Sequence, residues 1–244
     1  FAVRVSTVVR MHYRGQEMIE AVGEVAKQYQ LYLGDCLEVM RDIPDGSVDC
    51  VVTDPPYGLG FPYNSYEDTR DNLRGLIAGF MPEALRIARR RMLVFCGQTQ
   101  IQLYPEPNWI VAVTWNTTHS YGRCGFAQWT PLLIYGRDVQ GIGSVNGVLK
   151  SDIVPVGGGP NTKNNRTNDE LQHPCPKPPI MIRKVLNRFV EPHSSILDPL
   201  CGIGTIGVEA VKAGHSFIGI EIDPKYYAIA ERRIADAAAQ GRLF

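Results

Sequence analysis

Two strand–turn–helix patterns follow one another between residues 194 and 241. The first, SSILDPLCGIGTIGVEAVKAG, contains an apolar strand, a glycine-rich turn and an apolar helix. The second, SFIGIEIDPKYYAIAERRIADAAAQG, contains a strand with an acidic end and a longer helix, with Asp223 as N-cap, Pro224 in the first turn and Gly241 as the stop. Parallel strands joined by crossover helices form sheets that are covered on both faces. We therefore expect a doubly wound, Rossmann-like α/β fold.

The alternation of strands and helices extends through most of the chain. Runs of β-branched and aromatic residues predict strands, and apolar residues at helical spacing predict helices. The expected strands are LYL at 31–33, SVDCVVTD at 47–54, RMLVFCG at 91–97 and WIVAVTW at 109–115. The expected helices are 17–29, 73–88 with a fresh turn at Pro82, and 177–190 with Ile180, Val185, Leu186 and Phe189 facing inward. These elements predict one domain with a largely parallel sheet.

Composition narrows the classes of site and partner. The 25 basic and 25 acidic residues cancel, so a nucleic-acid partner would require positive charge gathered locally. The six cysteines form no CxxC pair, and therefore neither a zinc knuckle nor a dithiol redox site is predicted. No apolar run approaches the roughly 18 residues that cross a bilayer. We expect a cytoplasmic protein with reduced thiols, no metal and no membrane partner.

The glycine-rich turn carries the pattern GxGxxG at Gly202, Gly204 and Gly207, and Glu221 ends the next strand. Such glycines let the backbone approach a nucleotide, and such an acid accepts hydrogen bonds from ribose hydroxyls. Asp198 precedes the glycines and would repel a pyrophosphate, so the pattern favours a cationic cofactor such as S-adenosylmethionine. NAD, FAD and a turn that binds nothing are the alternatives.

A second motif, DPPY at 54–57, follows a valine-rich strand at the edge where ligands of open α/β folds bind. The two prolines hold φ at roughly −65° and stiffen the turn that carries Asp54 and Tyr57. Asp54 and the Pro55 carbonyl can accept both protons of an amino group on a planar ring, while Tyr57 stacks on the ring. This arrangement favours methyl transfer to an exocyclic amine such as that of adenine.

Together the motifs resemble those of the S-adenosylmethionine-dependent DNA amino-methyltransferases. The resemblance rests on GDCLEVM at 34–40, DPPY at 54–57, HPCPKP at 173–178, DPLCGIGTIG at 198–207 and IEID at 220–223. Cys175-Pro176 and Leu200-Cys201 depart from the residues usual in this family, although the prolines of both turns are kept.

The order of the motifs resembles the β class, in which the catalytic motif precedes the cofactor motif and a target-recognition segment lies between them. This order implies a circularly permuted methyltransferase fold. The implied divisions are 1–16 as an extension or disordered segment, 17–115 as the catalytic half, 116–172 as a small recognition insertion and 173–244 as the S-adenosylmethionine-binding half.

The resemblance also implies roles for individual residues. Asp54, Pro55, Pro56 and Tyr57 would hold a base flipped out of the duplex. The implied cofactor-binding residues are Asp35 and Cys36 at the adenine edge, Ile222 on the adenine, Glu221 at the ribose with Asp223 beside it, Asp198, Leu200, Gly202, Gly204 and Thr205 around the methionine, and Lys177 and Pro178 at the methionine end.

The implied activity is site-specific methylation of N6 of adenine in double-stranded DNA, because Asp rather than Ser at position 54 favours adenine in this family. N4-cytosine methylation is the nearest alternative. RNA or protein-glutamine methylation, and a cofactor-binding module without catalysis, are more distant ones. The resemblance is compatible with a homodimer and with a restriction endonuclease as partner, as in restriction-modification systems. The implied location is the cytoplasm, at the nucleoid.

Two stretches of the 116–172 segment bear on DNA recognition. WNTTHSYGRCGFAQWT at 115–130 mixes aromatic and polar residues, which suits base and phosphate contacts or a place in the core. VGGGPNTKNNR at 156–166 is loop chemistry that we expect a ligand to order.

Overall fold

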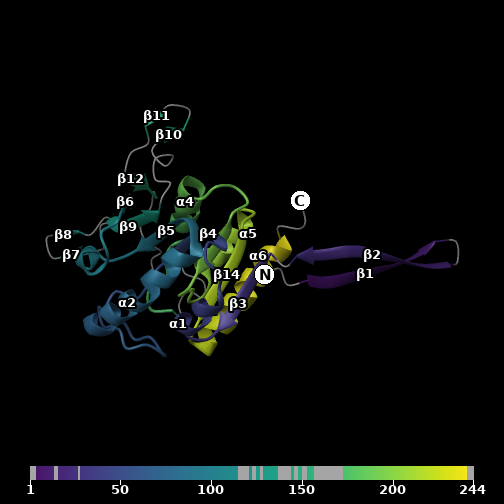
Figure 1. The fold of residues 1–244 in the computed structure, drawn as a ribbon, viewed down its shortest axis with the longest axis horizontal. Coiled ribbons are helices and arrows are strands. Elements are labelled where there is room, and N and C mark those ends of the chain that lie inside the picture. The colour runs from purple at the N-terminus through teal and green to yellow at the C-terminus, as the bar shows by residue number, and fades with distance from the viewer. Residues whose placement is uncertain are drawn as a thin grey trace.

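A computed structural model of the chain describes residues 4–13, 16–26, 28–114, 121–122, 125–126, 129–136, 144–145, 148–149, 153–156 and 173–240; the ranges before 28 and the residue pairs between 121 and 149 are described by their backbone alone. At its centre is an eight-stranded sheet (Figure 1). Its strands, in spatial order, are β12 (Ile153–Pro155), β6 (Trp109–Thr114), β9 (Trp129–Gly136), β5 (Ala88–Phe95), β4 (Val48–Thr53), β13 (Ser195–Asp198), β14 (Ser216–Glu221) and β3 (Tyr29–Leu33).

Helices cover both faces of this sheet, as the strand–helix alternation predicts. The helices α4 (Pro179–Phe189), α5 (Thr205–Lys212) and α6 (Pro224–Gln240) share one buried apolar cluster with the sheet. On the other face α1 (Cys36–Val39), the 3₁₀ helix η1 (Met40–Asp42) and α2 (Arg70–Ile87) form a second cluster. Alternate strand residues serve the two clusters: Val52 faces the first and Val51 the second, and both are fully buried. The expected doubly covered α/β sheet is confirmed.

The sheet is largely parallel, as expected, and it is mixed because β9 runs against the other strands. Strands β5, β4, β13, β14 and β3 run parallel to one another, but β9 pairs antiparallel with both β5 and β6. Six consecutive residues of β9, Thr130 to Tyr135, are buried. The segment 116–172 therefore contributes a core strand. The sequence analysis does not predict this strand for two reasons. The residues before it mix aromatic and polar side chains, and β9 itself is buried on both faces and therefore lacks the alternation of a half-buried strand.

Two helix predictions differ from the structure. Residues 17–29 were expected to be helical, but Gln16–Ala26 form strand β2, which pairs antiparallel with β1 (Arg4–Tyr13) and projects away from the body (Figure 1). The β-branched content of this segment suits an extended chain, and the pairing partner outweighs the apparent helical spacing. Pro82 starts no new helix, because α2 continues through it as one helix.

The predicted strands after residue 28 and the helix near 177–190 are confirmed, with one change in the buried face of α4. Ile180 is 40% exposed, whereas Met181 and Ile182 are buried alongside Val185 and Leu186. Ile180 lies in the first turn of α4, beside the loop that leads into it.

The parallel strands end at one edge of the sheet. Asp54 follows β4, Asp198 ends β13 and Glu221 ends β14, while Gly34 and Asp35 follow β3. The register aligns Glu221 with Leu33, and the Gly34 N–H donates to the Glu221 carbonyl at 2.9 Å. Motifs separated by up to 187 positions along the chain therefore meet along one edge, where ligands of such sheets bind.

Candidate active site

The edge is organised first by Asp198, at the tip of β13. Its side chain is 1% exposed, and Oδ1 accepts hydrogen bonds from Thr53 Oγ1 at 2.8 Å and from the Leu200 N–H at 3.1 Å. Burial raises the pKa of Asp198 to about 7, a shift that these two hydrogen bonds oppose and the Asp54 and Glu221 carboxylates reinforce. A buried acid of this kind is stabilised as an anion by a cationic ligand.

The proline turn holds Asp54 against Lys177. Lys177 Nζ lies 2.7 Å from each Asp54 carboxylate oxygen and 2.9 Å from the Tyr57 hydroxyl. The Tyr57 hydroxyl in turn donates to Asp54 Oδ1 at 2.8 Å, and Lys177 Nζ lies 4.7 Å from the centre of the Tyr57 ring. Burial, reinforced by Asp54, raises the pKa of Tyr57 well above its usual value, so this hydroxyl stays protonated. The three side chains form one hydrogen-bonded group.

Glu221 connects the glycine turn to the start of α6. One oxygen accepts from the Gly202 N–H and the other from the Asp223 N–H, both at 2.8 Å. Burial raises the pKa of Glu221. Asp223 is the N-cap expected from the sequence, because its Oδ1 accepts from the N–H groups of Lys225 at 2.8 Å and Tyr226 at 3.1 Å.

The glycines of the turn have different tasks. Gly202 has φ of 53°, in the left-handed region, and a β-carbon there would lie 3.2 Å from His173 Nε2. A β-carbon on Gly207 would instead lie 2.5 Å from the Phe217 ring, where α5 packs on the sheet. Gly202 therefore shapes the site, whereas Gly207 permits close packing of the helix.

A loop between β4 and α2 covers the edge of the sheet. Its organiser is Asp68, which is 3% exposed and accepts hydrogen bonds from three backbone N–H groups, those of Gly58 at 2.6 Å, Leu59 at 3.0 Å and Phe61 at 3.0 Å. The tip of this loop reaches the start of α6, because Ser65 Oγ donates to Asp223 Oδ2 at 2.8 Å.

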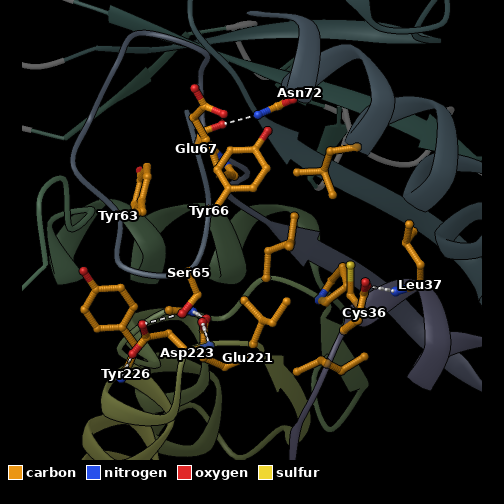
Figure 2. Close-up of a pocket in the computed structure, with 18 of the residues that line it drawn as sticks. Cys36, Leu37, Tyr63, Ser65, Tyr66, Glu67, Asn72, Glu221, Asp223 and Tyr226 are labelled. Carbon is orange, nitrogen blue, oxygen red and sulfur yellow. Dashed lines mark hydrogen bonds between the residues drawn. The ribbon is translucent and has the colours of Figure 1, made fainter. Parts of the chain in front are cut away.

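A cavity of about 510 Å³ lies between this loop and the strand ends. Figure 2 shows Tyr63 and Tyr66 on one side of it, Asp223 and Tyr226 on the opposite side, and Ser65 pointing across to Asp223. Its size suits a nucleoside-sized ligand. A second cavity of about 40 Å³, lined by Lys177, Asp198 and Thr205 among others, shares Asp54, His173, Leu200 and Gly202 with the first.

Most of the residues expected at the site line these two cavities. The larger cavity is lined by Asp35, Cys36, Asp54, Pro56, Leu200, Gly202, Glu221, Ile222 and Asp223, and the smaller one adds Lys177, Asp198 and Thr205. Pro55, Tyr57, Pro178 and Gly204 line neither, although Tyr57 bonds to Asp54, which lines both. Asp35 is the N-cap of α1, and one of its carboxylate oxygens accepts a hydrogen bond from the Leu37 N–H at 2.8 Å. Burial raises the pKa of the neighbouring Cys36 thiol to about 12.

Sequence reasoning missed the lining contributed by the loop and by His173. The missed residues include Tyr63, Ser65, Tyr66, Glu67, Asn72, His173 and Tyr226. The stretch FPYNSYED, which follows DPPYGLG, contains the aromatic signal for the loop, and His173 begins the HPCPKP motif. The His173 ring lies 5.0 Å from that of Tyr226 and 5.6 Å from that of Tyr63.

Two expectations about DNA recognition concern side chains or residues that lie outside the described part of the chain. The side chains of 115–128 and residues 157–166 are among them, so the proposed base and phosphate contacts of Trp115, His119, Tyr121, Arg123 and Phe126 stay predictions. Trp129 is described, and it lies partly buried at the start of β9.

Within the described ranges, no group of three or more His, Cys, Asp or Glu side chains is placed to hold a metal ion. Among the helices in those same ranges, none is both long and apolar enough to cross a membrane.

Comparison with known proteins finds relatives that are similar to this chain. The family described as N6/N4 DNA methylase matches residues 134–232, from β9 to α6. YubD of Escherichia coli strain K12, which is named as a methylase, is 26% identical over 215 residues, covering 83% of this chain and 88% of its own. The chain is similar to N6/N4 DNA methylases. The type II methyltransferase M.BglII of Bacillus subtilis is also 26% identical, over 249 residues that cover 82% of this chain and 67% of that enzyme.

Two solved structures resemble this chain in fold. The M1.HpyAVI–SAM complex superposes with a TM-score of 0.63 at 20% identity, covering 84% of this chain and 98% of its own. The PvuII DNA methyltransferase, named as cytosine-N4-specific, superposes with a TM-score of 0.63 at 13% identity, covering 88% of this chain and 93% of its own. At these identities the likeness concerns the fold alone.

Proposed function

We propose that this protein is an N6/N4 DNA methylase that transfers a methyl group from S-adenosylmethionine to N6 of adenine at a specific site in duplex DNA. The observation that carries the proposal is the group of Asp54 and Tyr57 beside a nucleoside-sized cavity with the buried acids Asp198 and Glu221 on its edge. An acceptor for amino protons and a site for a cationic nucleoside are thereby adjacent.

The residues of the two cavities fit S-adenosylmethionine. Each Glu221 oxygen accepts one backbone N–H and keeps a lone pair for a ribose hydroxyl. Ile222 is 47% exposed and lines the cavity, where it would pack on the adenine of the cofactor. Asp198, whose pKa burial raises to about 7, would be ionised by a nearby ammonium or sulfonium group. When bound, the cofactor supplies an electrophilic methyl group on a positively charged sulfur.

In the proposed reaction the target base leaves the duplex and stacks on Tyr57. Unstacking costs a few kcal/mol, and base–aromatic stacking of roughly 1–3 kcal/mol offsets much of that cost. Asp54 and the Pro55 carbonyl would each accept a hydrogen bond from one N–H of the amino group. These hydrogen bonds would draw the nitrogen lone pair out of the ring toward the methyl carbon. Asp54 is then the acceptor for the proton that the amine loses.

Chain order agrees with a circular permutation, which we include in the proposal. Strand β4, which leads to the proposed catalytic turn, comes before β13 in the chain. Thr53 at the end of β4 bonds to Asp198, 145 positions further along the sequence, because the two strands are parallel neighbours in the sheet. The proposed division into a catalytic half, a recognition segment and a cofactor half follows that order.

Cytosine N4 is the second candidate target, because one solved relative is named as cytosine-N4-specific. Asp at position 54 favours adenine within the family.

The test is to incubate the protein with unmethylated genomic DNA and labelled S-adenosylmethionine, and then to identify methylated nucleosides after complete digestion. We expect N6-methyladenine, and its loss in Asp54→Ala. Asp236→Asn, on the exposed face of α6, is the matched control and should behave as wild type. N4-methylcytosine without N6-methyladenine would contradict the choice of base, and no methylated nucleoside would contradict the proposed function. Single-molecule sequencing of the same DNA locates the site.

A further inference from the structure

Lys177 occupies the place that the proposed function reserves for the target amino group. Its Nζ donates to both Asp54 oxygens at 2.7 Å and contacts the Tyr57 hydroxyl at 2.9 Å. The nitrogen also lies 4.7 Å from the centre of the Tyr57 ring. An adenine N6 held by Asp54 and stacked on Tyr57 would need these same positions, so the base and Lys177 exclude one another.

Burial and three hydrogen-bond acceptors hold the Lys177 ammonium group in one position. The Lys177 side chain is 12% exposed, and the Asp54 side chain is 20% exposed. The three hydrogens of Nζ match three acceptors, the two carboxylate oxygens and the tyrosine oxygen. The Lys177 ammonium group is therefore held in the acceptor position whenever no base is present.

Lys177 also faces the side of the site where a methyl donor would lie. It lines the smaller cavity together with Asp198 and Thr205, and this cavity shares Asp54, Leu200 and Gly202 with the larger one. A cofactor that spans both cavities would present its reactive end to the Asp54–Lys177 pair.

We propose, resting on the proposed function, that Lys177 is itself a methyl acceptor when the enzyme holds S-adenosylmethionine without DNA. Lys177 Nζ passes one proton to an Asp54 oxygen, and the freed lone pair attacks the methyl carbon. A nitrogen–carbon bond forms while the carbon–sulfur bond breaks, and its electron pair stays on sulfur as a neutral thioether. The product is a methylated ammonium with two N–H donors and S-adenosylhomocysteine.

This step is slow compared with DNA methylation because the ammonium must lose a proton next to a carboxylate that stabilises it. A flipped adenine displaces Lys177 from Asp54 and thereby suppresses the step. If Lys177 serves only as a counter-ion for Asp54, no methyl group appears on it.

Lys184 provides the matched control, because it lies in α4, seven residues further along the chain. Its Nζ donates to the Pro155 carbonyl at 2.7 Å in an exposed position remote from Asp54. Chemical methylation without a site would label Lys184 at least as readily as Lys177.

The experiment incubates the full chain with S-adenosylmethionine carrying a labelled methyl group, with and without unmethylated genomic DNA. Peptides that contain Lys177 and Lys184 are then resolved by mass spectrometry, and methylated nucleosides are measured in parallel. We expect one added methyl group on Lys177, its loss in Lys177→Gln, its persistence in Lys184→Gln, and less of it when DNA is present.

The two proposals fail in different ways. Methylated DNA together with an unmodified Lys177 would overturn this inference and leave the proposed function intact. Methylation of Lys177 that DNA does not reduce, or equal methylation of Lys184, would also overturn it. If neither the DNA nor Lys177 acquires a methyl group, both the inference and the proposed function are overturned.

Discussion

At the scale of single residues, Asp198 shows how this site trades stability for binding. Its carboxyl group is almost completely buried, and burial raises its pKa to about 7 in spite of the hydrogen bonds from Thr53 and Leu200. The protonated form is therefore favoured in the folded protein, relative to an unfolded chain whose carboxyl has a pKa of 3.8. This contribution to stability is fully present below about pH 4 and is lost as the pH rises through 7.

We expect Asp198→Asn to remove this pH dependence. The amide is neutral at every pH, and its oxygen can still accept from Thr53 and Leu200. From pH 4 to pH 8 the variant should gain stability relative to wild type by an amount on the order of 4 kcal/mol, which corresponds to the shift from 3.8 to about 7. Urea unfolding of both proteins without ligand at the two pH values measures the difference.

Asp236→Asn serves as the control, since this exposed side chain on α6 should change stability little at either pH. A gain for Asp198→Asn that is equal at pH 4 and pH 8 would contradict a raised pKa of Asp198 in the folded protein.

At the scale of elements, one carboxylate makes several of the hydrogen bonds that hold the loop between β4 and α2. Asp68 accepts the N–H groups of Gly58, Leu59 and Phe61 and thereby closes the loop on itself. The loop then presents Ser65 to Asp223 across the cavity. The position of one wall of the site depends on these four hydrogen bonds.

Asp68→Asn should loosen this loop. The amide nitrogen cannot accept the two N–H groups of Leu59 and Phe61 that now bond to Oδ2. Hydrogen bonds to charged groups contribute about 1.5–3 kcal/mol each, so the loss should be measurable by thermal unfolding. Hydrogen exchange followed by mass spectrometry should show faster exchange over residues 58–68.

Asp71→Asn is the comparison for this experiment, because Asp71 is 87% exposed and pairs only with Arg74 at the start of α2 among its described contacts. Unchanged exchange over residues 58–68 in Asp68→Asn would show that other contacts hold the loop.

At the scale of the whole molecule, the central parallel strands join two distant parts of the chain. Asp49 Oδ2 accepts from the Ser195 N–H and Oγ, both at 2.9 Å, at the start of β4 and β13, and Thr53 bonds to Asp198 at their ends. The cavity lies across this junction, so a ligand that fills it contacts both parts. Binding and global stability should therefore be coupled.

S-adenosylhomocysteine should raise the melting temperature of the protein, whereas NAD should not. At a concentration about 100 times its Kd, a ligand that binds only the folded state adds about 2.7 kcal/mol. For a chain of this size that energy corresponds to a rise of roughly 5–10 °C. Differential scanning fluorimetry with the two compounds in parallel measures the shift. An equal rise with NAD would favour a dinucleotide site over the proposed one.

Local motifs were the part of the fold and site that sequence reasoning predicted well. The strands that end at Asp54, Asp198 and Glu221, and the N-cap at Asp223, are encoded by neighbouring residues, and the structure has each of them. The helix expected over 17–29 failed because pairing with a second strand outweighed an apparent helical spacing. Strand β9 was missed for a similar reason, since its direction depends on two partners remote in sequence.

The amino-acid sequence by itself determined the chemical identity of the site. It specifies acids at the ends of parallel strands, a proline-stiffened Asp-Pro-Pro-Tyr turn and a glycine turn that admits a ligand. Only the tertiary structure decided that Lys177 would lie on Asp54 and that a loop clamped by Asp68 would close the cavity. The physical reason is that the hydrogen bonds of Lys177 to Asp54 and of Ser65 to Asp223, which join residues 123 and 158 positions apart, form only after the sheet has brought its strand ends together.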